Sequence, residues 1–360
     1  MYTKHIKSLE WKGKIMRWRR ILLGGVLAIG VVTAMFTWSV DRVETGDKDL
    51  PTQVKDYMKW HHINGVALVS GKKGQPVVVK NKETSNKEKV VEANRLFPIA
   101  SLQKIMTGTA IYKLKQTGQL DWNTSLSTYY PQIPGSKSIT IRELLNHTSG
   151  LINNARPDSP LKGEKEQTAF MLKHIKYDHL HTWDYQDIDY ELLAAIISKQ
   201  THLSYNDYIK QTFAGPLNLR QIKDFSEVAK NEVPQPVNNV SWHEVTVTTS
   251  SDFGAGNLFM SPKDYWKFIN QAVLKNPKMI NTFSQQTQHE EVAYFGGVYF
   301  HNNVIAGNGS IPGYNSCFIA NYKTKETVMM FSNNIDYWDL KEDSDYILHH
   351  YVSYRPELRF

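Results

Sequence analysis

A serine and a lysine one helical turn apart, at the start of an apolar stretch, constrain this chain more than any other feature. Ser101 and Lys104 open a run whose apolar residues recur with helical spacing, at Leu102, Ile105, Met106, Ala110, Ile111 and Leu114. The spacing predicts a helix over residues 102–116 that is buried in a core. Residues i and i+3 share one face of a helix, so the amine of Lys104 is expected beside the Ser101 hydroxyl. A serine hydroxyl needs such a neighbouring base to become a nucleophile.

The bare Ser-x-x-Lys pattern is not specific. Two other copies begin at Ser70 and Ser159, both in polar, turn-rich stretches with no helix to present them. A serine at a helix start can also serve as the N-cap, where its hydroxyl accepts a backbone hydrogen bond. On this motif alone, Ser101 is therefore either a nucleophile or a cap.

The first forty residues predict a membrane anchor. Residues 1–20 hold seven Lys or Arg residues and one acidic residue, and residues 21–40 hold no charged residue. The uncharged stretch is long enough to cross a bilayer as a helix, and its basic flank places the N-terminus in the cytoplasm. A cleaved signal peptide, cut near Val32-Thr33-Ala34, is the alternative. We expect a cytoplasmic tail (1–20), a transmembrane helix (21–40), a linker (41–55) and an extracellular domain (56–360) in the cell membrane.

Charge and composition exclude several function classes. Six of the seven net positive charges lie in the basic tail, so the extracellular part has no basic surface of the kind that binds nucleic acid. The histidines show no His-Glu-x-x-His or comparable spacing, so neither a metal nor another cofactor is expected. Cys317 is the only cysteine, which excludes an intramolecular disulfide and favours a buried strand residue.

Strand patterns lie at both ends of the extracellular part, and helical patterns lie between them. Residues 66–69 and 76–79 predict a hairpin, and later strands are expected over 297–300, 316–321 and 328–332. Helices are expected over 141–146, 191–199, 264–274 and 346–351. This order predicts an α+β fold in which a mixed antiparallel sheet, closed by strands distant in sequence, is flanked by helices and carries an inserted, mainly helical lobe.

Five segments in a fixed order point to a family. They are residues 95–104, 139–151 (ending in Leu-Leu-Asn-His-Thr-Ser-Gly-Leu), 254–264, 295–297 and 309–314. Together they resemble the penicillin-binding-protein-like serine hydrolases related to class C β-lactamases, over roughly residues 60–335. The resemblance implies the fold of class C β-lactamases and DD-peptidases, with an acyl-serine intermediate on Ser101 and Lys104 as the base.

The same resemblance places two further motifs. The second, Tyr-x-Asn in the family, corresponds to Tyr185-Gln186-Asp187, and the third corresponds to Gly307-Asn308-Gly309. Tyr185 is then a proton relay or shares the role of base with Lys104, and the sequence leaves these two open. Substrate-binding roles are implied for Asp187, Asn308, Gly309 and Ser310. By analogy, the backbone N–H groups of Ser101 and Ser310 would form the oxyanion hole.

Two departures from the family pattern indicate the substrate. An aspartate replaces the second-motif asparagine, and the third motif lacks its Lys or His, so the cleft is more negative. A substrate carboxylate would lose a charge-assisted hydrogen bond there, roughly 1.5–3 kcal/mol. A D-alanyl ester instead offers a cationic amine, which suits Asp187, and the two departures also resemble the teichoic-acid D-alanyl esterases of the family.

The predicted function is therefore that of a membrane-anchored extracellular serine hydrolase. It would remove D-alanyl groups from teichoic acid, with a cell-envelope polymer as partner and no nucleic acid. The alternatives are a D,D-carboxypeptidase or penicillin-binding protein acting on peptidoglycan stem peptides, and an inactive wall-binding module of the same fold.

Overall fold

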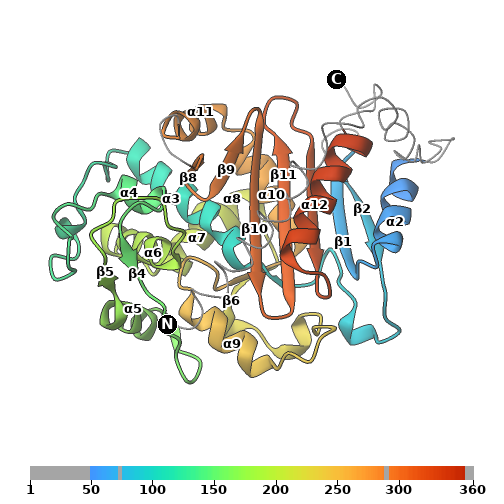
Figure 1. The fold of residues 1–360 in the computed structure, drawn as a ribbon, viewed down its shortest axis with the longest axis horizontal. Coiled ribbons are helices and arrows are strands. Elements are labelled where there is room, and N and C mark those ends of the chain that lie inside the picture. The colour runs from blue at the N-terminus through green and yellow to red at the C-terminus, as the bar shows by residue number, and fades with distance from the viewer. Residues whose placement is uncertain (1–48, 72–74, 288–291, 353–360) are drawn as a thin grey trace, which may run out of the picture. The chain divides into compact units, whose positions relative to one another are not determined.

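The computed structural model describes residues 49–71, 75–287 and 292–352, and a seven-stranded antiparallel sheet lies at its centre (Figure 1). The strand order is β2-β1-β12-β11-β10-β9-β8. The strands are β1 (Gly65–Ser70), β2 (Pro76–Asn81), β8 (Tyr294–Phe295), β9 (Val298–His301), β10 (Val304–Ile311), β11 (Tyr314–Asn321) and β12 (Thr327–Ser332). The predicted hairpin is confirmed, and β1 pairs with β12 so that Val66 lies opposite Phe331. Every pair in this sheet is antiparallel, so "mixed" was wrong for the strand directions of the described residues.

Both faces of the sheet are covered, because side chains alternate between two cores. On β1, Val66 and Leu68 belong to the larger apolar core, whereas Ala67 and Val69 belong to a smaller one. The smaller core packs under α2 (Leu50–Trp60), α12 (Tyr337–Ile347) and the π-turn η9 (Leu348–Val352). A strand buried on both faces has a continuous apolar sequence, and for this reason the sequence alone predicted β1.

The larger core lies between the sheet and the helical lobe. Its helices are α3 (Lys104–Gln116), α4 (Ile141–Leu145), α5 (Gly163–His174), α6 (Asp187–Thr201), α7 (Tyr205–Ile209), α8 (Gly215–Leu217), α9 (Trp242–Ser251), α10 (Pro262–Phe268) and α11 (Pro277–Gln285). Two small sheets accompany them: β3 (Phe97–Pro98), β7 (Leu258–Met260) and β6 (Ile222–Asp224) in one, and β4 (Leu151–Ile152) with β5 (Lys176–Tyr177) in the other. Figure 1 shows α4, α5 and α6 grouped beside the β8 edge of the central sheet.

Two glycines bring α3 into backbone contact with the turn between β8 and β9. A Cβ on Gly108 would lie 2.1 Å from the carbonyl oxygen of Gly296, and a Cβ on Gly297 would lie 2.2 Å from the backbone nitrogen of Ile105. No larger residue fits either position without moving backbone. The start of α3, and with it Ser101, is thereby fixed against the sheet.

Helix boundaries differ from the predicted ones where local geometry changes. The predicted helix at 102–116 starts as a 3-10 turn, η3 (Ala100–Gln103), and the one at 264–274 is α10 followed by a π-turn, η8 (Ile269–Val273). The terminal helix begins much earlier than residue 346, because Asp336 caps it by accepting from the N–H groups of Trp338 and Asp339.

The predicted anchor at residues 21–40 lies outside the described residues. Within the described ranges, no helix combines the length and the hydropathy that crossing a bilayer requires.

Candidate active site

Ser101 lies in the tight turn that leads directly into the buried helix α3. The turn has 3-10 geometry, and α3 begins at Lys104. Ala100 has a φ of 46°, a conformation that costs free energy for a residue with a side chain and that is enriched at functional sites. Ser101 is half-buried, and its Oγ accepts a hydrogen bond from Lys104 Nζ at 2.9 Å. Since Ser101 lies inside the turn and accepts no capping bond, the capping alternative is wrong.

Three oxygen atoms surround the ammonium group of the fully buried Lys104. Its Nζ donates to Ser101 Oγ at 2.9 Å, to Asp187 Oδ1 at 2.6 Å and to the carbonyl oxygen of Ala255 at 3.1 Å. Burial by itself would lower the pKa of Lys104, but the charge of Asp187, together with Tyr185, raises that pKa above its ordinary value. Lys104 is therefore an ammonium ion here, and it must release a proton before it can act as a base.

The second-motif residues reach Ser101 from the start of α6. Asp187 is the first residue of the helix, and 35% of its side chain is exposed. Burial favours a higher pKa for Asp187, but the charge and hydrogen bond of Lys104 hold the pKa below its usual range. The Tyr185 ring centre lies 5.0 Å from Lys104 Nζ, and its phenol lies close enough to Ser101 and Lys104 for both groups to lower its pKa. Burial nevertheless raises the pKa of Tyr185, so the phenol is protonated at neutral pH.

A buried histidine supports Tyr185 from behind. The His147 ring packs against the rings of Tyr185, Tyr190 and Tyr294, at centroid distances of 4.5, 5.1 and 4.9 Å. Its Nδ1 lies 2.8 Å from Asp189 Oδ2. Burial lowers the pKa of His147 and raises that of Asp189, so burial disfavours the charged form of each group. The His-Thr-Ser-Gly segment thus serves the site by fixing the position of an aromatic ring.

The glycine turn that begins at Gly254 is hydrogen-bonded to α3, the helix that follows Ser101. Thr107 Oγ1 donates to the carbonyl oxygen of Gly254 at 2.7 Å. Gly254 has a φ of +67°, and a Cβ there would lie 2.1 Å from the Cβ of Ala194 on α6. Held between two helices, the turn directs the carbonyl oxygen of Ala255 at Lys104.

The predicted third motif lies on β10, against the turn that carries Ser101. A Cβ on Gly309 would lie 2.2 Å from the carbonyl oxygen of Ile99, so only glycine allows this approach. The pairing of β9 with β10 ends at Ala306. From Gly307 onwards, β10 therefore has an edge that β9 does not cover, next to the site.

The side chains of Asn308 and Ser310 point to the face of the sheet that carries the smaller core, away from the face on which Gly309 meets Ile99. Asn308 lies in register with Cys317, whose side chain belongs to the smaller core under α12, and successive side chains of a strand alternate in direction. Within the described residues, no hydrogen bond joins either side chain to Ser101 or Lys104. The strand therefore brings its backbone close to the Ser101 turn, and the substrate-binding roles of Asn308 and Ser310 stay predictions.

Three charged residues of the site were missed in the sequence. Glu191 follows Asp187 by one turn of α6, Asp252 directly follows α9, and Arg156 Nη1 donates to Asp252 Oδ1 at 3.0 Å. Burial, with Asp187 nearby, raises the pKa of Glu191 well above its usual range and that of Asp252 to about 6. The i, i+4 spacing from Asp187 could have identified Glu191. Arg156 and Asp252 come from separate segments that only the tertiary fold brings together.

The arrangement has the parts that acyl transfer requires. It offers a hydroxyl nucleophile, an amine and a phenol that can carry its proton, and carboxylates that can bind a cation. In the described part of the chain, no cluster of three or more His, Cys, Asp or Glu side chains is arranged to hold a metal ion.

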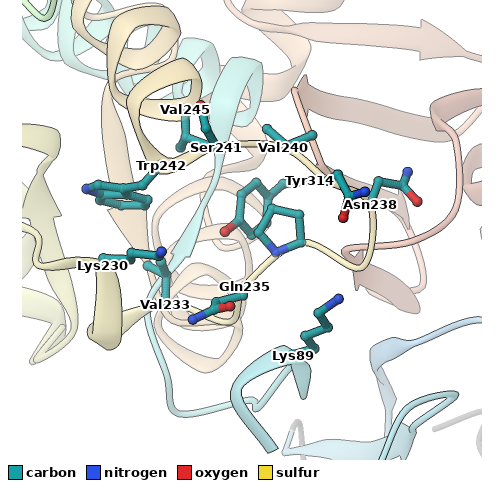
Figure 2. A pocket seen from close by; sticks show the side chains of 12 residues that line it. Lys89, Lys230, Val233, Gln235, Asn238, Val240, Ser241, Trp242, Val245 and Tyr314 are labelled. Atoms are coloured by element: carbon teal, nitrogen blue, oxygen red, sulfur yellow. The ribbon is translucent and has the colours of Figure 1, made fainter. Parts of the chain in front are cut away.

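A separate cavity of about 240 Å³ lies at the other end of α9 from Asp252 (Figure 2). Trp242 and Val245 of α9 and Tyr314 of β11 line it, together with Lys89 and Lys230. Its lining residues include these two lysines and no carboxylate. The helix that joins the cavity to the active site has ten residues, about 15 Å at 1.5 Å per residue.

Comparison with known proteins gives one family. The family profile described as "Beta-lactamase" matches residues 51–351. PbpX of Bacillus subtilis strain 168, which is named as a penicillin-binding protein, is 26% identical over 304 residues, covering 82% of this chain and 76% of PbpX. Protein flp of Staphylococcus aureus strain COL is 24% identical over 318 residues; the match covers 79% of this chain but only 63% of flp.

Solved structures share the fold. D-amino acid amidase from Ochrobactrum anthropi SV3 superposes with a TM-score of 0.72 at 20% identity, covering 84% of this chain and 98% of the amidase. FmtA from Staphylococcus aureus superposes with a TM-score of 0.71 at 22% identity, covering 86% of this chain and 87% of FmtA. At these identities the likeness concerns the fold alone.

Proposed function

Because the chain belongs to the beta-lactamase family of serine hydrolases, as its motifs predicted, we propose that it hydrolyses D-alanyl esters of teichoic acid with Ser101 as the nucleophile. The observation that carries this proposal is the convergence on Ser101 Oγ of Lys104 Nζ, at 2.9 Å, and the Tyr185 phenol. Asp187, rather than a neutral amide, completes the group at 2.6 Å from Lys104.

The proposed reaction has two steps. Ser101 Oγ attacks the ester carbonyl, its proton passes to Lys104 or Tyr185, and the polyol oxygen leaves with a proton from the same pair. Water then attacks the acyl-serine and releases D-alanine. Since Lys104 is an ammonium ion and the phenol is protonated in this structure, one of them must lose a proton before the first step. The backbone N–H groups of Ser101 and Ser310 are the proposed donors to the oxyanion.

The charges around the site support an acyl group that carries a cation. Asp187, Glu191 and Asp252 face Lys104 and Arg156, so carboxyls outnumber cations in this cluster. Gly307 stands at the third-motif position where the family has a cation. A D-alanyl ester has an ammonium group and no carboxylate on its acyl part, and this charge pattern matches the cluster.

The cavity of Figure 2 supports a polymeric alcohol as the leaving portion. Lys89 and Lys230 line it without a carboxylate, and Trp242 offers an apolar surface. Teichoic acid repeats a polyol phosphate, so an anionic unit lies at regular intervals from each ester. We include in the proposal the anchor at residues 21–40 and an extracellular position of the rest of the chain, where such a polymer is found.

Two substrates distinguish the proposal from its alternatives. The full-length protein is incubated with D-alanylated teichoic acid and with a peptide ending in D-Ala-D-Ala, and released D-alanine is measured. We expect release from the teichoic acid, and loss of that release in the Ser101→Ala variant. Release from the peptide alone would show a D,D-carboxypeptidase, and release from neither would favour an inactive wall-binding module.

A further inference from the structure

Asp187 is already committed to a partner, so it is not the residue that best binds the substrate amine. Its Oδ1 accepts a hydrogen bond from Lys104 Nζ at 2.6 Å, and the Lys104 side chain is buried. An incoming ammonium group would have to compete with that ion pair. A second anionic group is needed if the enzyme is to hold both cations.

Glu191 is such a group. It lies four residues after Asp187 on α6, so both side chains lie on the same side of the helix. Only 5% of Glu191 is exposed, and among the described residues no hydrogen bond reaches its carboxyl group. Carboxyls with so little exposure ordinarily have such partners, so Glu191 has free acceptor capacity close to Asp187 and Lys104.

Both cations near Glu191 are already paired with other carboxylates. Its charged neighbours are Asp187, Asp252, Lys104 and Arg156. Lys104 pairs with Asp187, and Arg156 pairs with Asp252 at 3.0 Å. Glu191 is the carboxyl of the cluster that has no cation of its own.

We propose that Glu191, assisted by Asp252, forms a subsite for the α-ammonium group of the D-alanyl substrate. The subsite rests on the proposed function, because the D-alanyl ester supplies the cation. Burial and the negative neighbours raise the pKa of Glu191 in the free protein. An ammonium group bound beside Glu191 would lower that pKa again and stabilise the carboxylate.

The test compares two ligands that differ only in this group. D-alanine methyl ester and D-lactic acid methyl ester share the ester and the methyl side chain, but the second has a hydroxyl in place of the ammonium. Binding of each is measured by calorimetry on the full-length Ser101→Ala protein, which cannot form the acyl-serine. We expect the alanine ester to bind at least about tenfold more tightly, as a charge-assisted hydrogen bond would provide.

Adding Glu191→Gln to the same protein should remove most of that preference, whereas Glu244→Gln, at an exposed position on α9, should leave it intact. Thermal unfolding checks that both variants are folded. Equal binding of the two esters, or a preference that survives Glu191→Gln, would overturn the subsite. Teichoic-acid hydrolysis by the unmodified protein is scored separately, so failure of the proposed function is distinguished from failure of the subsite.

Discussion

At the scale of single residues, the ion pair between Lys104 and Asp187 would decide how the proposed nucleophile, Ser101, is activated. The pair is short, and the lysine is fully buried. Asp187 raises the pKa of Lys104, which makes its ammonium form more stable and its free amine rarer. Nucleophile activation through Lys104 must therefore become easier as pH rises.

Asp187→Asn, which restores the amide usual in the family, should move the pH–rate profile. Removing the negative charge lowers the pKa of Lys104, so the rise of kcat/KM with pH should begin about one pH unit lower or more. The measurement is kcat/KM for a small D-alanyl ester over a range of pH. Asp339→Asn, at an exposed position on α12, is the control. Since Asp187 also raises the pKa of Tyr185, an unshifted profile in Asp187→Asn would show that Asp187 does not control the titration of the base.

Sequence motifs located the residues of the proposed catalytic group but not the charged residues around them. Ser101, Lys104, Tyr185 and Asp187 were all found, because the chemistry requires those residue types at a fixed spacing within short segments, and the structure brings them together. Arg156 and Asp252 were not found, since no local pattern marks two residues that meet only in the folded chain.

At the scale of secondary-structure elements, the placement of α3 depends on backbone contact with the turn between β8 and β9. Gly108 and Gly296 touch without any side chain between them. The hydrophobic periodicity predicted α3 correctly, but it contains no information on this contact. Helix ends were the least predictable feature, because the 3-10 turn before α3 and the π-turn after α10 depend on packing against other elements.

Gly108→Ala should destabilise the fold, because its methyl group would meet the Gly296 carbonyl at 2.1 Å. We expect the free energy of unfolding to fall by about 2–3 kcal/mol, the upper part of the range for overpacked cores. Chemical denaturation followed by tryptophan fluorescence measures this change. Gly215→Ala, where a Cβ meets no atom within 4 Å, is the matched control and should change stability little. A Gly108→Ala protein as stable as the parent would show that α3 can shift without cost.

At the scale of the whole molecule, the active site and the lysine cavity lie at the two ends of α9. The first would hold the D-alanyl group, and the second would hold part of the polymer that carries it. In this arrangement the active site would bind the cationic acyl part of the substrate, and the cavity would bind its anionic chain.

Lys89→Gln combined with Lys230→Gln should therefore weaken the reaction with the polymer only. We expect KM for D-alanylated teichoic acid to rise about fivefold, as the loss of two charge contacts at a solvent-accessible cavity implies. KM for a small D-alanyl ester should not change. The charge-matched control is Lys275→Gln with Lys278→Gln, both exposed and outside the cavity. Equal effects of the two double variants would reduce the cavity's role to that of general surface charge.

The pairing of β1 with β12 has a consequence for biogenesis. Val66 pairs with Phe331, which is synthesised 265 residues later (331 − 66). Contacts this distant in sequence slow folding, and until they form, β1 presents an open edge on which another polypeptide could add. A chain that terminates before β12 therefore exposes an unpaired strand edge, and we expect such a fragment to aggregate unless it is degraded.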